Sequence, residues 1–137
     1  KSILNSKPIK IFNFGKMSRD FTYIDDITES IIRCTFKKPI KNHPFNSEEE
    51  NSSTNAPHII LNIGNSKSIS LLRFVEILEI NLGIEAIKEF QPIQPGDVEN
   101  TFADISKLEK WINFSPIISI DEGLKRFSKW YKDYYGY

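Results

Sequence analysis

Cysteine is nearly absent from this 137-residue sequence, because Cys34 is its one copy. A single thiol excludes a disulfide framework and a cysteine metal cluster, and it is typical of a reducing compartment, so we expect a cytoplasmic protein. The two histidines, His43 and His58, have no partner at metal-ligand spacing, so no metal site is expected. No apolar run approaches the roughly 18 residues that span a bilayer, and no charged-then-apolar leader is present, so we expect no membrane partner.

Glycine is scarce as well, with six copies, and none of them forms the G-x-G-x-x-G spacing that binds a dinucleotide. None of the five tyrosines is followed by lysine at the fourth position, so the sequence has no Tyr-x-x-x-Lys pair either. The segment Gly64-Asn65-Ser66-Lys67-Ser68 is similar to the end of a P-loop but lacks the first glycine, which favours a structural turn. We therefore expect no catalytic residue and no cofactor-binding residue in this sequence.

Net charge is absent, because 18 basic residues balance 18 acidic ones. Neither sign forms a block that would attract nucleic acid, so an anionic ligand must be held by a few local groups. Hydrophobic residues make up 39% of the sequence and charged residues 26%, which is ordinary for a globular domain. We expect a single domain over residues 1–137, since a chain of this length buries roughly two thirds of its unfolded surface.

The hydrophobic spacing predicts an α/β chain. Asp26 is predicted to cap a first long helix, Ser68 or Ser70 a second that Gly83 ends, and Ser119 with Glu122 a last one. Residues 39–57 are rich in proline, serine, asparagine and glutamate, so we expect a mobile surface loop there. The other expected elements are a helical turn at 1–5, strands at 9–14, 58–63 and 86–90, an extended run at 19–24, a loop at 91–103 and a helix at 106–112.

Three segments, in this order and at this spacing, carry a resemblance to a known family. They read KIFNFGKMSRDFTYIDD at 10–26, APHIILNIGN at 56–65, and QPGDVENTFAD at 94–104, and the chain ends in WYKDYYGY. Together they resemble the C-terminal half of nucleotide-sugar epimerases of the extended short-chain dehydrogenase family, especially the UDP-glucuronate 4-epimerase branch. The resemblance covers nearly the whole chain apart from residues 39–57.

The resemblance implies the C-terminal substrate-binding portion of an extended short-chain dehydrogenase (Rossmann-type) fold, with the cofactor half missing. In that family the other half binds NAD and supplies the catalytic tyrosine and lysine, and a hydride moves from the sugar C4 to NAD and back. We therefore expect a fragment, inactive alone, that closes over a UDP-sugar. The apolar surface that a missing half leaves behind favours a homodimer or other self-association.

Arg19 and Asp97 are the charged candidates for substrate binding. A diphosphate needs paired donors with delocalised charge, which a guanidinium supplies, and the family places the arginine of this RDF segment near the phosphates. The alternative for Arg19 is a surface ion pair with Asp20. Asp97 either accepts hydrogen bonds from ribose hydroxyls or stabilises its own turn.

The other candidates for substrate binding are Ile11, Phe12, Asn13 and Gln94. Residues 11–13 resemble the strand end whose main-chain groups contact the uracil edge in related epimerases, while the Ile11 and Phe12 side chains are expected in the core. Asn13 contacts the base or shapes the turn. Gln94 stands where other epimerase branches carry arginine, which favours the glucuronate branch.

Several other polar and aromatic residues are expected to be structural. Asp25, Asp26 and Asp104 each precede a helical stretch, where capping explains a carboxylate without chemistry. The aromatic residues Trp111, Trp130, Tyr131 and Tyr134 are expected to pack on helices rather than form a stacking platform, because no basic groove accompanies them. Two alternatives to the epimerase stay open: a related nucleotide-sugar dehydratase or decarboxylase, and a non-catalytic binding or assembly module.

Overall fold

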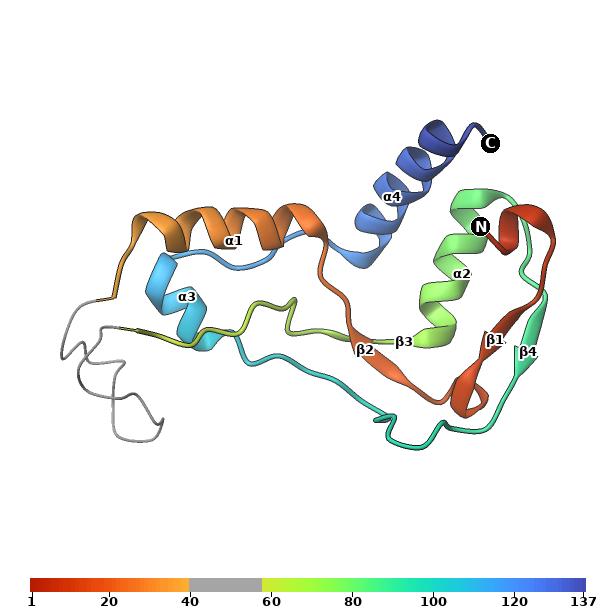
Figure 1. The fold of residues 1–137 in the computed structure, drawn as a ribbon, viewed down its shortest axis with the longest axis horizontal. Coiled ribbons are helices and arrows are strands. Elements are labelled where there is room, and N and C mark those ends of the chain that lie inside the picture. Colours follow the sequence, from red (N-terminus) through yellow and green to blue (C-terminus); the bar gives the residue numbers. More distant parts are fainter. Residues whose placement is uncertain (40–57) are drawn as a thin grey trace.

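The computed structural model describes residues 1–39 and 58–137, and it has mixed α and β structure. The elements are η1 (Ile3–Asn5), β1 (Ile9–Ile11), η2 (Phe12–Gly15), β2 (Ser18–Asp20), α1 (Ile24–Phe36), β3 (Ser68–Ser70), α2 (Leu71–Leu82), β4 (Lys88–Phe90), α3 (Ser106–Ile112) and α4 (Ile120–Tyr135). They form an elongated molecule, with α1 and α3 at one end and α2, β1 and β4 at the other (Figure 1). None of the described helices combines the length and apolar character needed to cross a membrane.

Two small sheets organise the chain. β1 runs parallel to β4, with Ile9 opposite Lys88 and Ile11 opposite Phe90. β2 runs antiparallel to β3, with Arg19 opposite Ile69. Because a parallel pair needs a long crossover, residues from the two ends of a long stretch of sequence meet in the first sheet.

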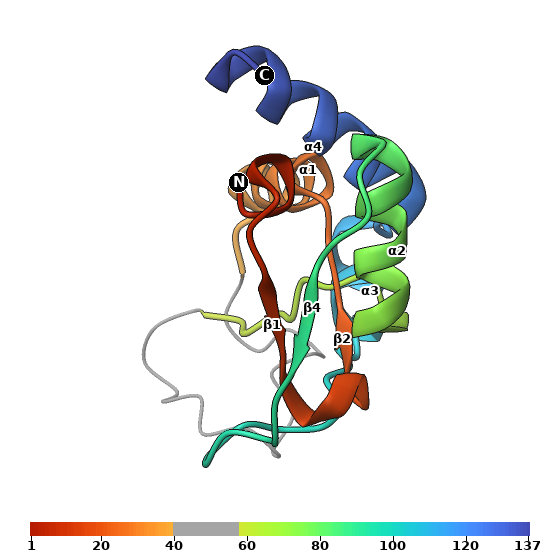
Figure 2. The same cartoon turned by 90° about the vertical axis from the view of Figure 1, so that its right-hand side faces the viewer.

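Each end of the molecule has its own hydrophobic core. The first core packs α2 on β1 and β4 around Ile3, Ile11, Val75 and Ala86, and Figure 2 shows α2 alongside these two strands. The second core is made by α3 and the segment that precedes it, through Ile105, Leu108, Trp111 and Ile112. α4 packs against α2, and α1 contacts α3.

The helix boundaries confirm several predictions. The Ser70 side chain accepts a hydrogen bond from the Arg73 N–H at 3.2 Å and so caps α2, which Gly83 ends. Ser119 accepts from the Glu122 N–H at 3.3 Å and caps α4. α3 has the predicted bounds.

Predictions that depended on extended structure were partly wrong. β1 ends at Ile11 rather than at residue 14, because Asn13 and Phe14 take left-handed conformations with φ of 48° and 50°. No strand forms at 58–63, although Ile59, Leu61 and Ile63 pack against the second core while Ile60 is exposed. The alternation of side chains is therefore real, but these residues have no pairing partner in the part of the chain that the structure describes.

The start of α1 also differs from its prediction. The helix begins at Ile24, with Tyr23 as its N-cap, so the extended run expected at 19–24 ends at Asp20. Asp26 is not the cap: it lies in the first turn, is 3% exposed, and accepts a hydrogen bond from the Ile118 N–H at 2.9 Å. The helical turn expected at residues 1–5 is the short 3-10 turn η1. The mobile loop expected at 39–57 lies, apart from Pro39, outside the described residues.

Candidate functional site

Most of the candidate residues lie near the last residue of β1 and the first residues of β2, where both strands meet the loop that follows β4. Figure 1 shows these segments side by side. The Gln91 N–H donates to the Ile11 carbonyl at 2.8 Å, and the Phe14 N–H donates to the Gln91 carbonyl at 3.0 Å. These two bonds hold the start of the loop against η2. Residues 11–14 are therefore brought beside a segment that lies some eighty positions later in the sequence.

The same loop is then fastened along β2. The Ser18 N–H donates to the Glu99 carbonyl at 2.8 Å, and the Thr101 N–H donates to the Ser18 carbonyl at 3.2 Å. The Asp20 N–H donates to Oγ1 of Thr101 at 3.0 Å. The loop thus links the end of β1 to β2, and its position relative to Arg19 is set by main-chain hydrogen bonds.

Arg19 points from β2 to this loop. Its Nη2 donates to Oδ1 of Asp97 at 3.0 Å, and its Nη1 donates to the carbonyls of Ser18 at 2.9 Å and Glu99 at 3.0 Å. The side chains of Arg19 and Asp97 are 23% and 33% exposed, so solvent reaches both. A guanidinium has five N–H donors, so it can hold these partners and an anion at the same time.

The structure thus brings together the two charged candidates, Arg19 and Asp97. The alternative partner that the sequence suggested for Arg19, its neighbour Asp20, does not pair with it. The carboxylate of Asp20 is instead used by main-chain groups: Oδ1 accepts from the Asn65 N–H at 2.9 Å, and Oδ2 accepts from the N–H groups of Ser66 and Ala103, both at 3.0 Å. Sequence reasoning missed this role because the three donors lie far from Asp20 along the chain.

The P-loop-like segment takes part in the same cluster of bonds. The N–H groups of Asn65 and Ser66, which follow Gly64, point at the Asp20 carboxylate. An acidic side chain therefore occupies the place where a P-loop would hold phosphate. This confirms the interpretation of residues 64–68 as a structural turn.

The segment 11–13 is a tight, well-anchored turn. Ile11 is 1% exposed and its side chain lies in the first core, as expected, whereas Phe12 is only partly buried and belongs to neither core, because η2 turns the chain away after β1. Asn13 Nδ2 donates to the Lys16 carbonyl at 2.9 Å, and the Lys16 N–H donates to the Asn13 carbonyl at 2.8 Å. Asn13 therefore shapes the turn, which was one of the two roles the sequence left open for it.

Gln94 and Asp97 are the two ends of one turn. The Asp97 N–H donates to the Gln94 carbonyl at 3.1 Å, and Gly96 between them has a φ of 85°. Glycine adopts this left-handed conformation without a steric penalty. The turn directs Asp97 toward Arg19, while the Gln94 side chain is exposed.

The remaining carboxylates have structural partners. Asp104 Oδ1 accepts from the Ser106 N–H at 2.9 Å, and this bond lowers the pKa of the Asp104 carboxyl. Asp25 lies 3.4 Å from Arg126. Among the described residues, no group of three histidine, cysteine or acidic side chains is placed to hold a metal ion. Partial burial raises the pKa of the Cys34 thiol, which favours its protonated form.

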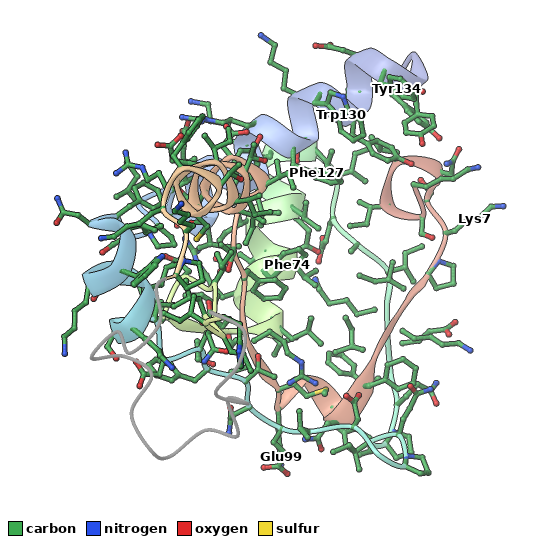
Figure 3. All side chains as sticks on the ribbon, turned by 60° about the vertical axis from the view of Figure 1, so that its left-hand side comes forward. Lys7, Phe74, Glu99, Phe127, Trp130 and Tyr134 are labelled. Carbon is green, nitrogen blue, oxygen red and sulfur yellow. The ribbon has the colours of Figure 1, made fainter. Side chains whose placement is uncertain are left out.

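The aromatic residues divide into two groups. Trp111 is 2% exposed and packs in the second core, as predicted. Trp130, Tyr131 and Tyr134 pack against one another on α4, with the Trp130 and Tyr134 rings stacked at 5.5 Å, but Trp130 and Tyr134 stay 52% and 69% exposed and are not part of a core. Figure 3 shows both on α4 together with Phe127, at the end of the molecule opposite Glu99.

Comparison with known proteins gives a consistent result, although no protein-family model matches the chain. The chain is 40% identical over 136 residues to CapI of Staphylococcus aureus, covering 98% of this chain and 41% of the relative. It is 41% identical over 134 residues to a UDP-glucuronate 4-epimerase of Thermodesulfobacterium geofontis, covering 97% of this chain and 36% of that protein. The chain is a relative of the UDP-glucuronate 4-epimerases.

A solved structure of such an epimerase has the same fold over nearly all of this chain. The UDP-glucuronic acid 4-epimerase from Bacillus cereus, in complex with UDP-glucuronic acid and NAD, is 30% identical and superimposes with a TM-score of 0.77. The match covers 98% of this chain and 38% of the epimerase. The chain thus spans about two-fifths of the length of these epimerases, and the predicted extended short-chain dehydrogenase fold is confirmed.

Proposed function

We propose that this chain is the UDP-sugar-binding part of an NAD-dependent nucleotide-sugar 4-epimerase that interconverts UDP-glucuronate and UDP-galacturonate. The observation that carries the proposal is the match of almost the whole chain to UDP-glucuronate 4-epimerases at 30% to 41% identity. The position of Arg19 supports it, because a guanidinium that is 23% exposed and lies beside a main-chain turn suits a diphosphate.

Each candidate residue has a role in this proposal. Arg19 binds the diphosphate, and Asp97 accepts hydrogen bonds from the ribose while it orients the guanidinium. The main-chain groups of Ile11, Phe12 and Asn13 contact the uracil edge. Gln94 lies on the same turn as Asp97 and faces solvent, where it can reach the phosphates or the sugar.

The redox chemistry belongs to residues outside this chain. Bound NAD would supply reversible hydride transfer at the sugar C4, and no residue of this chain is assigned to the cofactor or to proton transfer. The chain binds and encloses the nucleotide part of the substrate. Mixed with UDP-glucuronate and NAD, it should therefore form no UDP-galacturonate, and measurable turnover would contradict this division of roles.

The role of Arg19 is tested by calorimetric titration of UDP and of uridine into the wild-type chain and Arg19→Gln. Loss of the guanidinium should weaken UDP binding by about tenfold or more, as expected for a charge-assisted hydrogen bond, and leave uridine binding nearly unchanged. Arg73→Gln is the matched control, since Arg73 is a half-exposed arginine of α2 that pairs with Glu76 and Asp121. Equal loss of UDP and uridine affinity in Arg19→Gln would refute a phosphate contact.

We also propose that the chain self-associates through its exposed apolar surface. A hollow of about 280 Å³ between α2 and the start of α4 is lined by Phe21, Phe74 and Phe127 and contains none of the candidate substrate residues. The half-exposed Trp130 and the exposed Tyr134 continue this surface along α4 (Figure 3). Sedimentation should show a concentration-dependent increase in mass, whereas a constant monomer mass would exclude self-association.

We propose, in addition, that the protein is cytoplasmic, which is the location expected from its single cysteine.

A further inference from the structure

Asp20 is hydrogen-bonded to the other segments of the candidate site, although its carboxylate does not pair with Arg19. Its carboxylate accepts three main-chain hydrogen bonds, from Asn65, Ser66 and Ala103, at 2.9 to 3.0 Å. Its own N–H donates to Oγ1 of Thr101 at 3.0 Å. Three otherwise separate segments of the described chain therefore meet at one side chain.

These bonds add to the two main-chain bonds between Ser18 and the loop, and together they set where Arg19 and Asp97 stand relative to each other. Arg19 precedes Asp20 in β2, so fixing Asp20 fixes the start of the Arg19 side chain. Thr101 and Ala103 close the loop that carries Asp97, and both are held by Asp20. The ion pair of Arg19 and Asp97 is itself partly open to water, where such pairs contribute little, so it cannot hold the loop alone.

The charge of Asp20 matters as much as its position. A free carboxylate beside Arg19 would compete with a phosphate for the guanidinium. Asp20 follows Arg19 in β2, so the two side chains point to opposite faces of the strand, and three N–H donors satisfy the Asp20 carboxylate there. The guanidinium then faces one carboxylate, that of Asp97, and two neutral carbonyls.

We propose that Asp20 is the positioning residue of the diphosphate site: with its main-chain N–H and its carboxylate it holds the loop of Asp97 against β2, on the face of the strand opposite Arg19. This inference rests on the function proposed above. It assigns Asp20 no contact with the substrate.

The test compares UDP affinity in wild-type, Asp20→Asn, Arg19→Gln and the double variant. An asparagine presents an NH2 group to N–H donors, so the clamp loosens. Asp20→Asn should weaken UDP binding by about tenfold, which is the loss expected when a charge-assisted hydrogen bond is misplaced. In the Arg19→Gln background, the same substitution should have little further effect on UDP affinity. An unchanged affinity, or an equal loss in the Arg19→Gln background, would overturn the positioning role.

Two controls separate positioning from general destabilisation. Asp104→Asn removes another carboxylate that accepts a main-chain N–H, from Ser106, and should leave UDP affinity unchanged. Thr101→Val removes only the acceptor of the Asp20 N–H, so it should cause a milder loss of UDP affinity. This variant replaces Asp20→Asn in the test if Asp20→Asn fails to fold. A loss in Asp104→Asn equal to that in Asp20→Asn, or no loss in Thr101→Val, would count against the inference.

Amide NMR spectra of the unliganded chain distinguish this inference from the function on which it rests. In Asp20→Asn the amide signals of Asn65, Ser66 and Ala103 should move, and those of Arg19 and Asp97 should move with them. If wild-type chain does not bind UDP, the proposed function fails, and the spectra decide the positioning role alone. Unmoved signals at Arg19 and Asp97 would then overturn it.

Discussion

Replacing Gly64 by alanine tests the packing beneath the candidate site. A Cβ at this position would lie 2.4 Å from the Cβ of Ala103 and 3.1 Å from Oδ2 of Asp20. Two carbon atoms in ordinary contact lie about 3.5 to 4.0 Å apart, so the backbone at 64 or 103 would have to shift by about 1 Å. That shift would stretch the hydrogen bonds that Asp20 accepts from both segments.

The expected loss of stability follows from this overlap. Overpacking typically costs about 1–3 kcal/mol, and the Cβ of Ala103 cannot rotate away because it is bonded directly to the backbone, so we expect Gly64→Ala to lower the free energy of unfolding by about 2–3 kcal/mol. With a urea m-value of about 1–3 kcal/mol/M for small proteins, the midpoint should fall by about 1 M or more. Urea unfolding followed by circular dichroism measures this.

The cause of the loss is isolated by a second substitution. Ala103→Gly removes the atom that the new methyl group would meet, so it should recover at least half of the stability lost in Gly64→Ala. The same change should rescue nothing in Gly96→Ala, where a Cβ would meet open space and the cost arises only from a φ of 85°. If the Gly64→Ala, Ala103→Gly double variant is as unstable as Gly64→Ala, the steric argument is wrong.

Two further predictions concern the ion pair of Glu79 with Lys88 and the second core. Glu79 accepts hydrogen bonds from Lys88 and from a main-chain N–H, and these lower the pKa of its carboxyl, so its stabilising effect is present above the unfolded-state pKa and is lost as the pH falls through the folded-state pKa. In urea unfolding, Glu79→Gln should therefore lower the free energy of unfolding by about 1–2 kcal/mol at neutral pH, and this loss should shrink toward zero in strong acid. At neutral pH the exposed Glu85→Gln should cost far less, and an equal cost would contradict the role given to Glu79. Leu108→Ala, at a fully buried position of the second core, should lower the free energy of unfolding by about 2–5 kcal/mol in the same urea experiment. Ile80 is 69% exposed, so Ile80→Ala should lower it far less, and equal losses would contradict the assigned core.

Features encoded by neighbouring residues were predicted well from the sequence. Ser70 and Ser119 cap their helices because a hydroxyl and the N–H three residues later are local partners. Asp26 shows the limit of the same rule. Its carboxylate accepts a hydrogen bond from the N–H of Ile118, 92 residues away, and α1 begins two residues before Asp26.

Features that need distant partners were not predictable from one sequence. The strand expected at 58–63 has the right alternation, yet a strand also needs a neighbour to pair with. The resemblance to epimerases singled out Arg19 and Asp97 separately, but their ion pair joins residues 78 positions apart. The role of Asp20 was missed for the same reason, since its donors follow it by 45 to 83 residues.

The most direct test of the central claim is a titration of this chain with UDP, followed through its backbone amide signals. If residues 11–13, Arg19 and Asp97 form the wall that holds a uridine diphosphate, the amides of Phe12, Arg19 and Asp97 should shift together and saturate at one dissociation constant. The amide of Arg33 on α1 should stay in place. Silence at Phe12, Arg19 and Asp97 while UDP is in large excess would contradict the proposed site.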